Sequence, residues 1–381
     1  MAVQSHAGAS RKRLTMKVLF RTDASIQIGT GHVMRCLTLA DALAAKGAQC
    51  TFICRQHAGN LIEYIRNKGH AVNSLHMGTG ADADLAHSEW LGATQAQDAQ
   101  ACASTTATLQ PDWLVVDHYA LDARWESALA KHCGQVMVID DLADRPHACQ
   151  VLLDQTFGRN AKDYRPLVPD DCTLLCGSTY ALLRPEFAAL RPYSLQRRVQ
   201  PKLKHLLVTL GGVDKDNVTA QVLNALRGCP LPADCEITVV MGATAPWLAA
   251  VQQQAQTMAW PTTVRVGVSN MAQLMADSDL AIGAAGATSW ERCCLGLPSI
   301  LVVLADNQAS IAAALANAGA VVQLELPDLP RLLAQIPAAS GDPAALTSMS
   351  QAASKICNGE GAERVASQIM RAHNEDHIAL Q

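Results

Sequence analysis

The sequence is poor in aromatic residues, which make up 4% of its 381 residues, and it has no long hydrophobic run. Packing must therefore rest on aliphatic side chains, since alanine and leucine are abundant. The longest apolar segments, such as residues 299–305, have the length of a strand. They fall far short of the roughly 20 apolar residues that are needed to span a bilayer. We therefore expect no insertion into a membrane.

The sequence also lacks a strong charge of one sign, because 30 Lys and Arg against 34 Asp and Glu leave a net charge of -4. This balance argues against broad electrostatic binding of DNA or RNA. With 49% hydrophobic and 17% charged residues, the composition is typical of a soluble globular enzyme. The length allows two or three domains, each with its own core.

None of the 13 cysteines forms a C-x-x-C motif. Cysteines four residues apart on a predicted strand are about 13 Å apart, too far to share a metal. We therefore expect buried thiols in a reducing cytoplasm and no metal site. Residues 1–15 are polar, with Arg11-Lys12-Arg13, and no apolar stretch follows them, so we do not expect a signal peptide. Met16 is a candidate for the true start.

Short β-branched runs alternate with longer helical patterns, which predicts parallel sheets covered by helices on both faces. The predicted strands are residues 16–20, 50–54, 113–116, 135–139, 151–153, 173–175, 206–210, 236–240, 263–266, 280–282, 299–303 and 321–324. The clearest predicted helices are 32–46, 59–68, 91–108, 122–132, 217–227 and 361–373. The fold class is therefore α/β, with two doubly wound, Rossmann-like domains.

A change of composition near residues 191–202, with two prolines and several basic residues, predicts an exposed linker between the domains. The predicted parts are a disordered extension at 1–15, an N-terminal domain at 16–190, a linker at 191–203, a C-terminal domain at 204–345, and helices with a tail at 346–381. Sheets of this kind bind ligands at the carboxyl ends of their strands. A cleft between the two domains is therefore the expected site.

The most informative segment is residues 21–35, where a strand enters a glycine-containing loop and a helix begins near Gly31 and His32. Such a loop offers backbone N–H groups and a helix N-terminus to a phosphate. It is neither a P-loop nor a complete G-x-G-x-x-G motif. A helix N-terminus disfavours the protonated imidazole, so His32 is a candidate proton acceptor. A turn that happens to contain a histidine is an equal alternative.

Two loops in the second half follow predicted strands. Gly211 and Gly212 allow the backbone to approach a phosphate closely, although an ordinary tight turn explains them equally well. The next loop contains Val268, Ser269, Asn270 and Met271. Its backbone groups can read the edge of a planar base, whereas capping of the next helix by Ser269 or Asn270 is the alternative.

A third loop, residues 283–289, is built of small residues and opens a helix. Backbone N–H groups from Gly286 onward, with the Thr288 hydroxyl, are candidates to hold a diphosphate. Glu291, one turn into the helix, is a candidate acceptor for two adjacent ribose hydroxyls. The alternative is a capping box formed by Thr288 and Glu291.

In the first half, Asp117, His118 and Tyr119 follow the strand at 113–116 and are expected to point into the cleft. Asp140 and Asp141 follow the next strand; since adjacent side chains diverge, we interpret them as a helix cap and turn. The remaining histidines show no supporting pattern and are expected to be structural or solvated: His57, His70, His76, His87, His132, His147, His205, His373 and His377.

The informative segments occur in one order along residues 16–310. They are Arg21-x-Asp23, Gly29-x-Gly31-His32-x-x-Arg35, Asp117-x-Tyr119, Leu183-Arg184-Pro185-Glu186-Phe187, Gly211-Gly212, Ser269-Asn270-Met271, Gly283-x-x-Gly286-x-Thr288-x-Trp290-Glu291 and Asp306-Asn307-Gln308. As an ordered set, this resembles the UDP-2,4-diacetamido-2,4,6-trideoxy-β-L-altropyranose hydrolases of pseudaminic acid biosynthesis. It is similar, more distantly, to the lipid II-forming N-acetylglucosaminyltransferase of peptidoglycan synthesis.

The resemblance implies a GT-B fold, in which the C-terminal domain holds UDP and the N-terminal domain holds the sugar. It implies metal-independent hydrolysis at the anomeric carbon with inversion, by a monomeric cytoplasmic enzyme without a cofactor, in a pathway linked to flagellin glycosylation. His32 would be the base for water. Asp23 and Tyr119 would orient water or sugar, and Asn307 would contact the sugar or the phosphate. The further substrate-binding residues would be Gly29, Gly31, Arg35, Gly211, Gly212, Val268, Ser269, Asn270, Met271, Gly286, Thr288, Glu291 and Gln308.

The chain departs from the family pattern at two places. Ala284-Ala285 is less glycine-rich than expected, and His118 stands where a small polar residue is expected, which would alter sugar specificity. Two other functions remain open. One is a glycosyltransferase of the same fold, against which the polar loop at 55–60 argues, and the other is a silent nucleotide-sugar-binding module, against which His32 with Asp23 and Arg35 argues.

Overall fold

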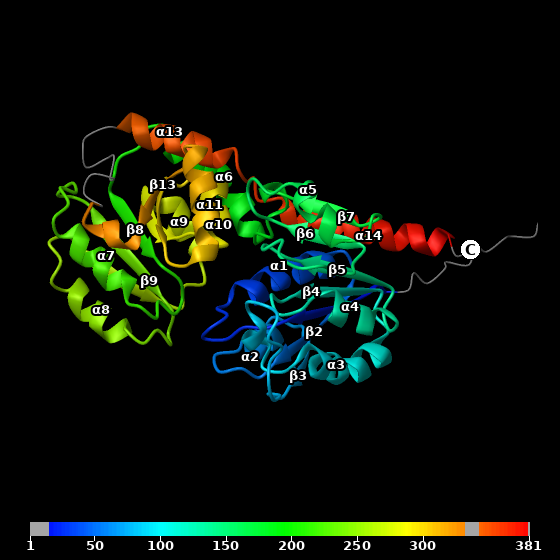
Figure 1. The fold of residues 1–381 in the computed structure, drawn as a ribbon. Coiled ribbons are helices and arrows are strands. Elements are labelled where there is room, and N and C mark those ends of the chain that lie inside the picture. The colour runs from blue at the N-terminus through cyan, green and yellow to red at the C-terminus, as the bar shows by residue number, and fades with distance from the viewer. Residues whose placement is uncertain (1–14, 332–342, 380–381) are drawn as a thin grey trace, which may run out of the picture.

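The computed structural model describes residues 15–331 and 343–379, which form two domains built on parallel sheets (Figure 1). The predicted extension falls, apart from residue 15, outside the described residues. Every strand predicted from the sequence is present, and the α/β class is confirmed. The structure adds one strand that the sequence pattern missed, Ala71–Leu75.

The N-terminal sheet has the order β3-β2-β1-β4-β5-β6-β7, and all its neighbouring strands are parallel. Its strands are β1 (Lys17–Thr22), β2 (Gln49–Arg55), β3 (Ala71–Leu75), β4 (Trp113–Asp117), β5 (Gln135–Ile139), β6 (Val151–Asp154) and β7 (Thr173–Cys176). Its helices are α1 (Gly31–Ala45), α2 (Ile62–Asn67), α3 (Gln95–Leu109), α4 (Ala123–Ala130) and α5 (Ala161–Tyr164), with 3-10 turns η1 (Ser88–Leu91), η2 (Arg165–Leu167) and η3 (Ser178–Tyr180).

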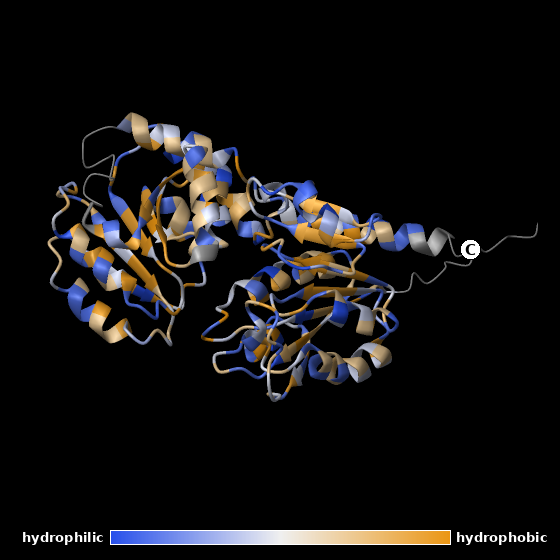
Figure 2. Ribbon diagram, viewed as in Figure 1, coloured by the Kyte–Doolittle hydropathy of each residue, from blue (hydrophilic) through white to orange (hydrophobic). Residues whose placement is uncertain are grey.

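Both faces of this sheet are buried, because successive side chains of a strand point to opposite faces. In β1, Phe20 packs into one core with α1, whereas Leu19 packs into the other core with α3 and α4. Strands buried on both faces read as continuous apolar runs, and Figure 2 shows them in orange in both domains.

The C-terminal sheet has the order β10-β9-β8-β11-β12-β13 and is also parallel. Its strands are β8 (His205–Thr209), β9 (Glu236–Met241), β10 (Thr262–Val266), β11 (Leu280–Ala284), β12 (Ser299–Val303) and β13 (Val321–Glu325). Its helices are α7 (Val218–Leu226), α8 (Leu248–Ala255), α9 (Met271–Asp277), α10 (Thr288–Cys294), α11 (Asp306–Asn317) and α13 (Pro343–Ser354), with the 3-10 turn η4 (Leu326–Arg331).

Two helices connect the domains. The helix α6 (Pro185–Arg197) follows the N-terminal sheet but packs on α9 and α10, and its Phe187 is buried in the C-terminal core. The last helix, α14 (Gly361–Ala379), returns to pack on α1, as Figure 1 shows in red. The expected exposed linker at 191–203 is therefore different in the structure: residues 191–197 are helical, and the Ser194 and Arg198 side chains are buried.

Each sheet reverses its strand order at one point, between β1 and β4 in the first domain and between β8 and β11 in the second. Open α/β sheets bind ligands outside the carboxyl ends of the strands at such a switch point. Figure 1 shows the loop before α1 on the side of its domain that faces the C-terminal domain. Within the described residues, no helix has the length and apolar character required to cross a membrane.

Candidate active site

His32 is the second residue of α1, and its imidazole lies against the end of β4. The side chain is 9% exposed, and its Nδ1 lies 2.6 Å from Oδ1 of Asp117. Asp117 is the last residue of β4 and stands opposite Thr22 at the end of β1. An ionised carboxylate can only accept hydrogen bonds, so the contact places the imidazole proton on Nδ1 and leaves the lone pair on Nε2. His32 is thereby arranged to accept a proton at Nε2.

Arg35, one turn further along α1, holds Asp117 in place. Its Nε and Nη2 each donate to a different carboxylate oxygen at 2.7 Å. Burial raises the pKa of Asp117, but the charges of Arg35 and then His32 outweigh it, so the net pKa lies well below its usual range. Asp117 thus stays ionised near neutral pH. Arg35, a predicted substrate ligand, is buried and supports the His32–Asp117 pair.

Tyr119, which the resemblance suggested as an orienting residue, completes this group and lies next to His32. The two rings meet edge to face with centroids 4.6 Å apart. The Tyr119 hydroxyl donates to Oδ2 of Asp141 at 2.9 Å, and Arg35 also donates to that oxygen. Burial, followed by the charge of Asp141, raises the pKa of Tyr119 well above its usual range. The hydroxyl therefore stays protonated and serves as a donor.

An aromatic wall stands beside Tyr119 and comes from the segment between β3 and α3. The rings of His87 and Trp90 have their centroids 5.5 and 6.0 Å from that of Tyr119. His87, which we expected to be structural or solvated, thus belongs to the surroundings of the site. A sugar ring offers apolar C–H faces that such a wall can contact.

Asp23 is completely buried at the end of β1 and does not reach the surface. Its Oδ1 lies 2.8 Å from Nη1 of Arg21 and accepts the backbone N–H of Arg55 at 2.6 Å. Its Oδ2 faces Nε2 of His57 at 3.6 Å and Nε2 of His118 at 3.5 Å. In the structure, Asp23 therefore faces His57 and His118 in the interior. The resemblance had led us to expect it in contact with water or the sugar.

His118 is buried beside Asp23, and its tautomer follows from its contacts. Its Nδ1 accepts the backbone N–H of Ala120 at 3.1 Å, so the proton of the neutral ring is on Nε2 and faces Asp23. Burial lowers the pKa of His118 in spite of the neighbouring carboxylate. Any effect of His118 on sugar specificity would act through its neighbours, because its side chain is 2% exposed.

The loop before α1 forms hydrogen bonds within itself. Ser25 accepts three backbone N–H groups, those of Gln27 and Ile28 on its Oγ and that of Gly29 on its carbonyl. Those N–H groups are therefore not free for a phosphate, contrary to our interpretation of this loop. Gly29 has φ +80°, a conformation that favours glycine, and the space beside Gly29 and Gly31 is open. A ligand can approach the backbone at both glycines.

In the C-terminal domain, Gly211 and Gly212 follow β8 and have open space where a side chain would be. Gly211 has φ +101°, which explains the glycine whether or not a ligand is present. The carboxylate of Asp214 accepts the N–H groups of Val218 and Thr219 at 2.9 Å. The first turn of α7 is thus occupied by the chain's own acid.

The loop after β10 presents exposed polar residues. Ser269 and Asn270 are exposed, and Val268 and Met271 are half-buried against the core. Asn270 is the residue that precedes α9, and within the described part of the chain its side chain makes no capping hydrogen bond. The capping alternative therefore does not account for Asn270, which leaves its side chain available to a ligand.

In the loop that leads into α10, helix capping likewise fails to explain the candidate ligand Thr288. Thr288 is the first residue of this helix and is exposed, and no side-chain cap is formed there by a described residue. The alternative capping box of Thr288 and Glu291 is therefore absent from this region. Space beside Gly286 is open, whereas the N–H of Ser289 already donates to the Gly286 carbonyl. The free donors are thus fewer than the sequence suggested.

Glu291 is 18% exposed and lies 3.8 Å from Nη2 of Arg184. Burial raises the pKa of Glu291 to about 7, with Arg184 and Arg292 acting in the opposite direction. Gln308 accepts the backbone N–H of Leu304 at 3.1 Å and closes the loop after β12. The side chain of Asn307 lies outside the described residues.

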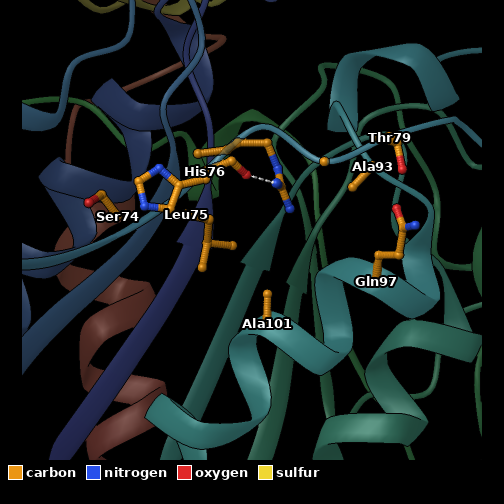
Figure 3. Close-up of a pocket in the computed structure, with 9 residues that line it drawn as sticks. Ser74, Leu75, His76, Thr79, Ala93, Gln97 and Ala101 are labelled. Atoms are coloured by element: carbon orange, nitrogen blue, oxygen red, sulfur yellow. Dashed lines mark hydrogen bonds between the residues drawn. The ribbon is translucent and has the colours of Figure 1, made fainter.

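A separate pocket of about 370 Å³ lies between the segment after β3 and the first half of α3 (Figure 3). Its lining includes His76, Thr79, Ala93 and Gln97, and no predicted site residue is part of it. Arg55, which also lines it, donates to the carbonyl of His76 and to Asp98. Through Arg55, the pocket therefore borders the buried carboxylates of Asp23 and Asp98, but it is not the candidate site.

Sequence reasoning missed Asp117 as the partner of His32 and misread Asp141. Asp140 does close a turn, since it accepts the N–H groups of Leu142 and Ala143, but Asp141 binds Arg35 and Tyr119. A usable signal existed for Asp117: it is an acid at the carboxyl end of an apolar strand, where ligands of such sheets bind.

Comparisons with known proteins agree with this architecture. Residues 205–369 match the model of the glycosyltransferase family 28 C-terminal domain. The chain superposes on MurG from Acinetobacter baumannii with a TM-score of 0.68 and 17% identity, over 93% of this chain and 99% of that one. It superposes on UDP-GlcNAc 2-epimerase from Neisseria meningitidis with a TM-score of 0.59 and 13% identity, over 94% and 100%. The chain has the GT-B fold.

Two further proteins match the chain in sequence. The UDP-2,4-diacetamido-2,4,6-trideoxy-β-L-altropyranose hydrolase of Campylobacter jejuni is 27% identical over 310 residues, which cover 81% of this chain and 99% of the relative. The spore coat polysaccharide biosynthesis protein SpsG of Bacillus subtilis is 32% identical over 155 residues, 40% of this chain and 44% of that one. The resemblance drawn from the sequence motifs is thereby confirmed.

Proposed function

We propose that this GT-B protein hydrolyses UDP-2,4-diacetamido-2,4,6-trideoxy-β-L-altropyranose to UDP and the free sugar, a step toward pseudaminic acid. The observation that carries the proposal is the His32–Asp117 pair, 2.6 Å apart, at the switch point of the N-terminal sheet. The similarity to the Campylobacter jejuni hydrolase along nearly its whole length supports the choice of substrate.

In the proposed reaction, Nε2 of His32 takes a proton from a water molecule as its oxygen attacks the anomeric carbon. The bond between that carbon and the UDP oxygen breaks, and its electron pair leaves with the diphosphate. Attack from the face opposite UDP inverts the anomeric centre. Asp117, held ionised by Arg35, stabilises the imidazolium that forms and keeps the ring in the productive tautomer.

The C-terminal domain would hold the UDP. Glu291 would accept hydrogen bonds from the ribose hydroxyls, and the exposed groups of residues 268–271 would face the uracil ring. The open glycines Gly211, Gly212 and Gly286 would let the backbone approach the diphosphate, with Thr288 as a side-chain donor. Asn307 and Gln308 are proposed to border the diphosphate and the sugar.

A transferase of the same fold would use a sugar or lipid hydroxyl where the hydrolase uses water. The match to a glycosyltransferase domain keeps this second function in view. The two differ in one measurable respect, because a hydrolase releases UDP without any acceptor.

The test is phosphorus NMR of the purified protein with the UDP-2,4-diacetamido sugar in the absence of an acceptor. Proton NMR of the sugar in the same tube follows the configuration of the first product. We expect free UDP and an inverted anomeric hydroxyl. Release of UDP only after an acceptor alcohol is added would contradict hydrolysis and favour transfer.

A further inference from the structure

The C-terminal switch point contains a buried arginine that the reaction proposed above does not use. Arg292 in α10 is 1% exposed. Its Nη2 donates to the Ala284 carbonyl at 2.7 Å and to Oγ of Ser289 at 3.1 Å. Its Nε and Nη1 are buried and have no hydrogen-bond partner among the described residues.

Gly283 makes room for this guanidinium. A Cβ added at Gly283 would clash with Nη1 of Arg292 and lie 2.9 Å from the Thr209 carbonyl. Gly283 in β11 pairs with Thr209 in β8, so the guanidinium lies where these two strands end. Gly211 follows one of these strands and Gly286 the other. The charge is therefore placed beneath the two glycine loops.

The positive charge of Arg292 has no salt bridge to a described carboxylate. Burial lowers its pKa to about 10, and the opposing effects of Cys293 and Glu291 are smaller. Removing a charge from water is costly unless an opposite charge or a full set of hydrogen bonds replaces the water. Arg198 has a pKa lowered to about 10 in the same way, so the two unpartnered donors of Arg292, and not its pKa, point to an anion that is part of the functional state.

Arg198, which follows α6, shows how the same fold buries an arginine for structural reasons. It is 5% exposed, and all three of its nitrogens donate to backbone carbonyls, including Gly296, Met275 and Ser278. Its donors are satisfied by the protein alone, whereas those of Arg292 are not. The difference separates a structural arginine from one that awaits a ligand.

We infer that Arg292 is the buried counter-charge of the nucleotide diphosphate, acting through the loop at residues 283–289 as a positioning residue. The inference rests on the proposed function. Because the diphosphate gains negative charge as it leaves, a fixed cation in a region of low dielectric stabilises both the bound nucleotide and the departing UDP. Its one expected influence on the uridine portion is indirect, because Arg292 helps to lower the pKa of Glu291.

The test compares UDP, inorganic pyrophosphate and uridine by calorimetry on the full chain, on Arg292→Met and on the matched control Arg198→Met. Above pH 8, where Glu291 is largely ionised, we expect affinity for UDP and pyrophosphate to fall about tenfold or more in Arg292→Met, while affinity for uridine stays within about twofold. In Arg198→Met we expect a lower melting temperature with an unchanged ratio of UDP to uridine affinity. Single-turnover rates on the sugar nucleotide should fall in Arg292→Met as well.

Equal losses for UDP and uridine, or no loss for UDP, would overturn the inference and leave the proposed function standing. A wild-type protein that binds neither UDP nor pyrophosphate would overturn both. If Arg292→Met does not fold, Arg292→Lys and Arg292→Gln decide the matter. The lysine variant should keep most of the preference for UDP over uridine, and the glutamine variant should lose it; equal behaviour of the two would refute a role for the charge.

Discussion

The two switch points of this molecule differ in whether their buried charges lie next to opposite charges of the protein. In the N-terminal domain, Asp117 is bound by both His32 and Arg35, and Asp23 faces Arg21. In the C-terminal domain, Arg292 lies under loops of small residues without a described carboxylate partner. At the first site these charges face opposite charges of the protein itself, whereas at the second site Arg292 does not.

This difference matches what each domain would contribute to the reaction. A proton acceptor must have its tautomer and orientation set before substrate arrives, which a complete network of acids and arginines achieves. A site for a diphosphate gains affinity if it holds uncompensated positive charge that the ligand neutralises. Chemistry and nucleotide binding should therefore respond separately to substitution.

The largest expected effect comes from His32→Ala. Loss of a general base typically costs about 10² to 10⁴ in rate, and we expect a loss within that range. Binding of UDP should stay within about twofold, since His32 belongs to the other domain. Single-turnover rates and UDP calorimetry measure the two quantities. His70→Ala, which removes an imidazole whose Nε2 lies 2.7 Å from Oδ1 of Asp41, is the control.

Turnover in His32→Ala that matches the wild type would remove this residue from the mechanism. A loss of UDP affinity as large as the loss of rate would show that the two domains do not divide the work as proposed.

Asp117→Asn should have the next largest effect. The amide removes the charge that orients His32 and stabilises its imidazolium, and loss of such an outer partner costs about 10- to 100-fold in activity. Arg35 keeps only Asp141, so unfolding should also be easier by about 3 kcal/mol. Rates are compared at a temperature where both proteins remain folded, as judged by circular dichroism.

The matched control for Asp117→Asn is Glu126→Gln, because Glu126 is also buried and its Oε1 lies 2.7 Å from Nδ1 of His147. This variant should lose stability while its rate per folded molecule stays the same. An equal loss of rate in both variants would mean that general loosening of the domain, and not the orientation of His32, explains the result.

The fold could be predicted where strands are buried on both faces. Residues 113–116 of β4 and 300–303 of β12 read as unbroken apolar runs because no face of either strand meets water. β3 was missed since it is an edge strand whose residues are only half-buried and partly polar. The linker prediction failed for a different reason: Arg191 and Arg198 look like solvated cations but donate to carbonyls of the C-terminal domain.

The sequence predicts which residues follow each strand, but it does not predict which strands lie side by side. His32 and Tyr119 were both chosen from the sequence, and the structure places them in contact. The pairing of His32 with Asp117 depends on β1 lying next to β4, a topological fact that local patterns do not contain. Arg292 was overlooked because an arginine in an amphipathic helix is usually solvated, and only the packing around Gly283 reveals its burial.

The pH dependence of uridine binding tests the second switch point with a smaller effect. Burial raises the pKa of Glu291 to about 7, so half of the Glu291 carboxyl groups are protonated at that pH. Ribose hydroxyls donate to the ionised form. Affinity should therefore rise about tenfold from pH 6 to pH 8 and level off above that, following the ionised fraction.

Uridine is the probe for this experiment because it lacks the phosphates, whose own titration would overlap. NMR titrations at each pH give the affinity. Glu291→Gln should bind about 1–3 kcal/mol more weakly at pH 8 and show a flat profile. A wild-type profile that is equally flat would exclude the carboxylate from ribose recognition.

The smallest expected effect lies outside both switch points, at the ion pair that joins α1 to α14. Lys46 binds Glu363 on the surface, where the Glu363 side chain is 62% exposed. Water and salt screen such pairs, so Glu363→Gln should change the free energy of unfolding by less than about 1 kcal/mol and leave turnover unchanged. Ile369→Ala on the same helix is the contrast, because Ile369 is fully buried in the N-terminal core and its loss should cost about 2–5 kcal/mol. Urea unfolding of both variants measures this difference. A loss for Glu363→Gln as large as that for Ile369→Ala would show that charge, and not apolar packing, holds α14 against the N-terminal domain.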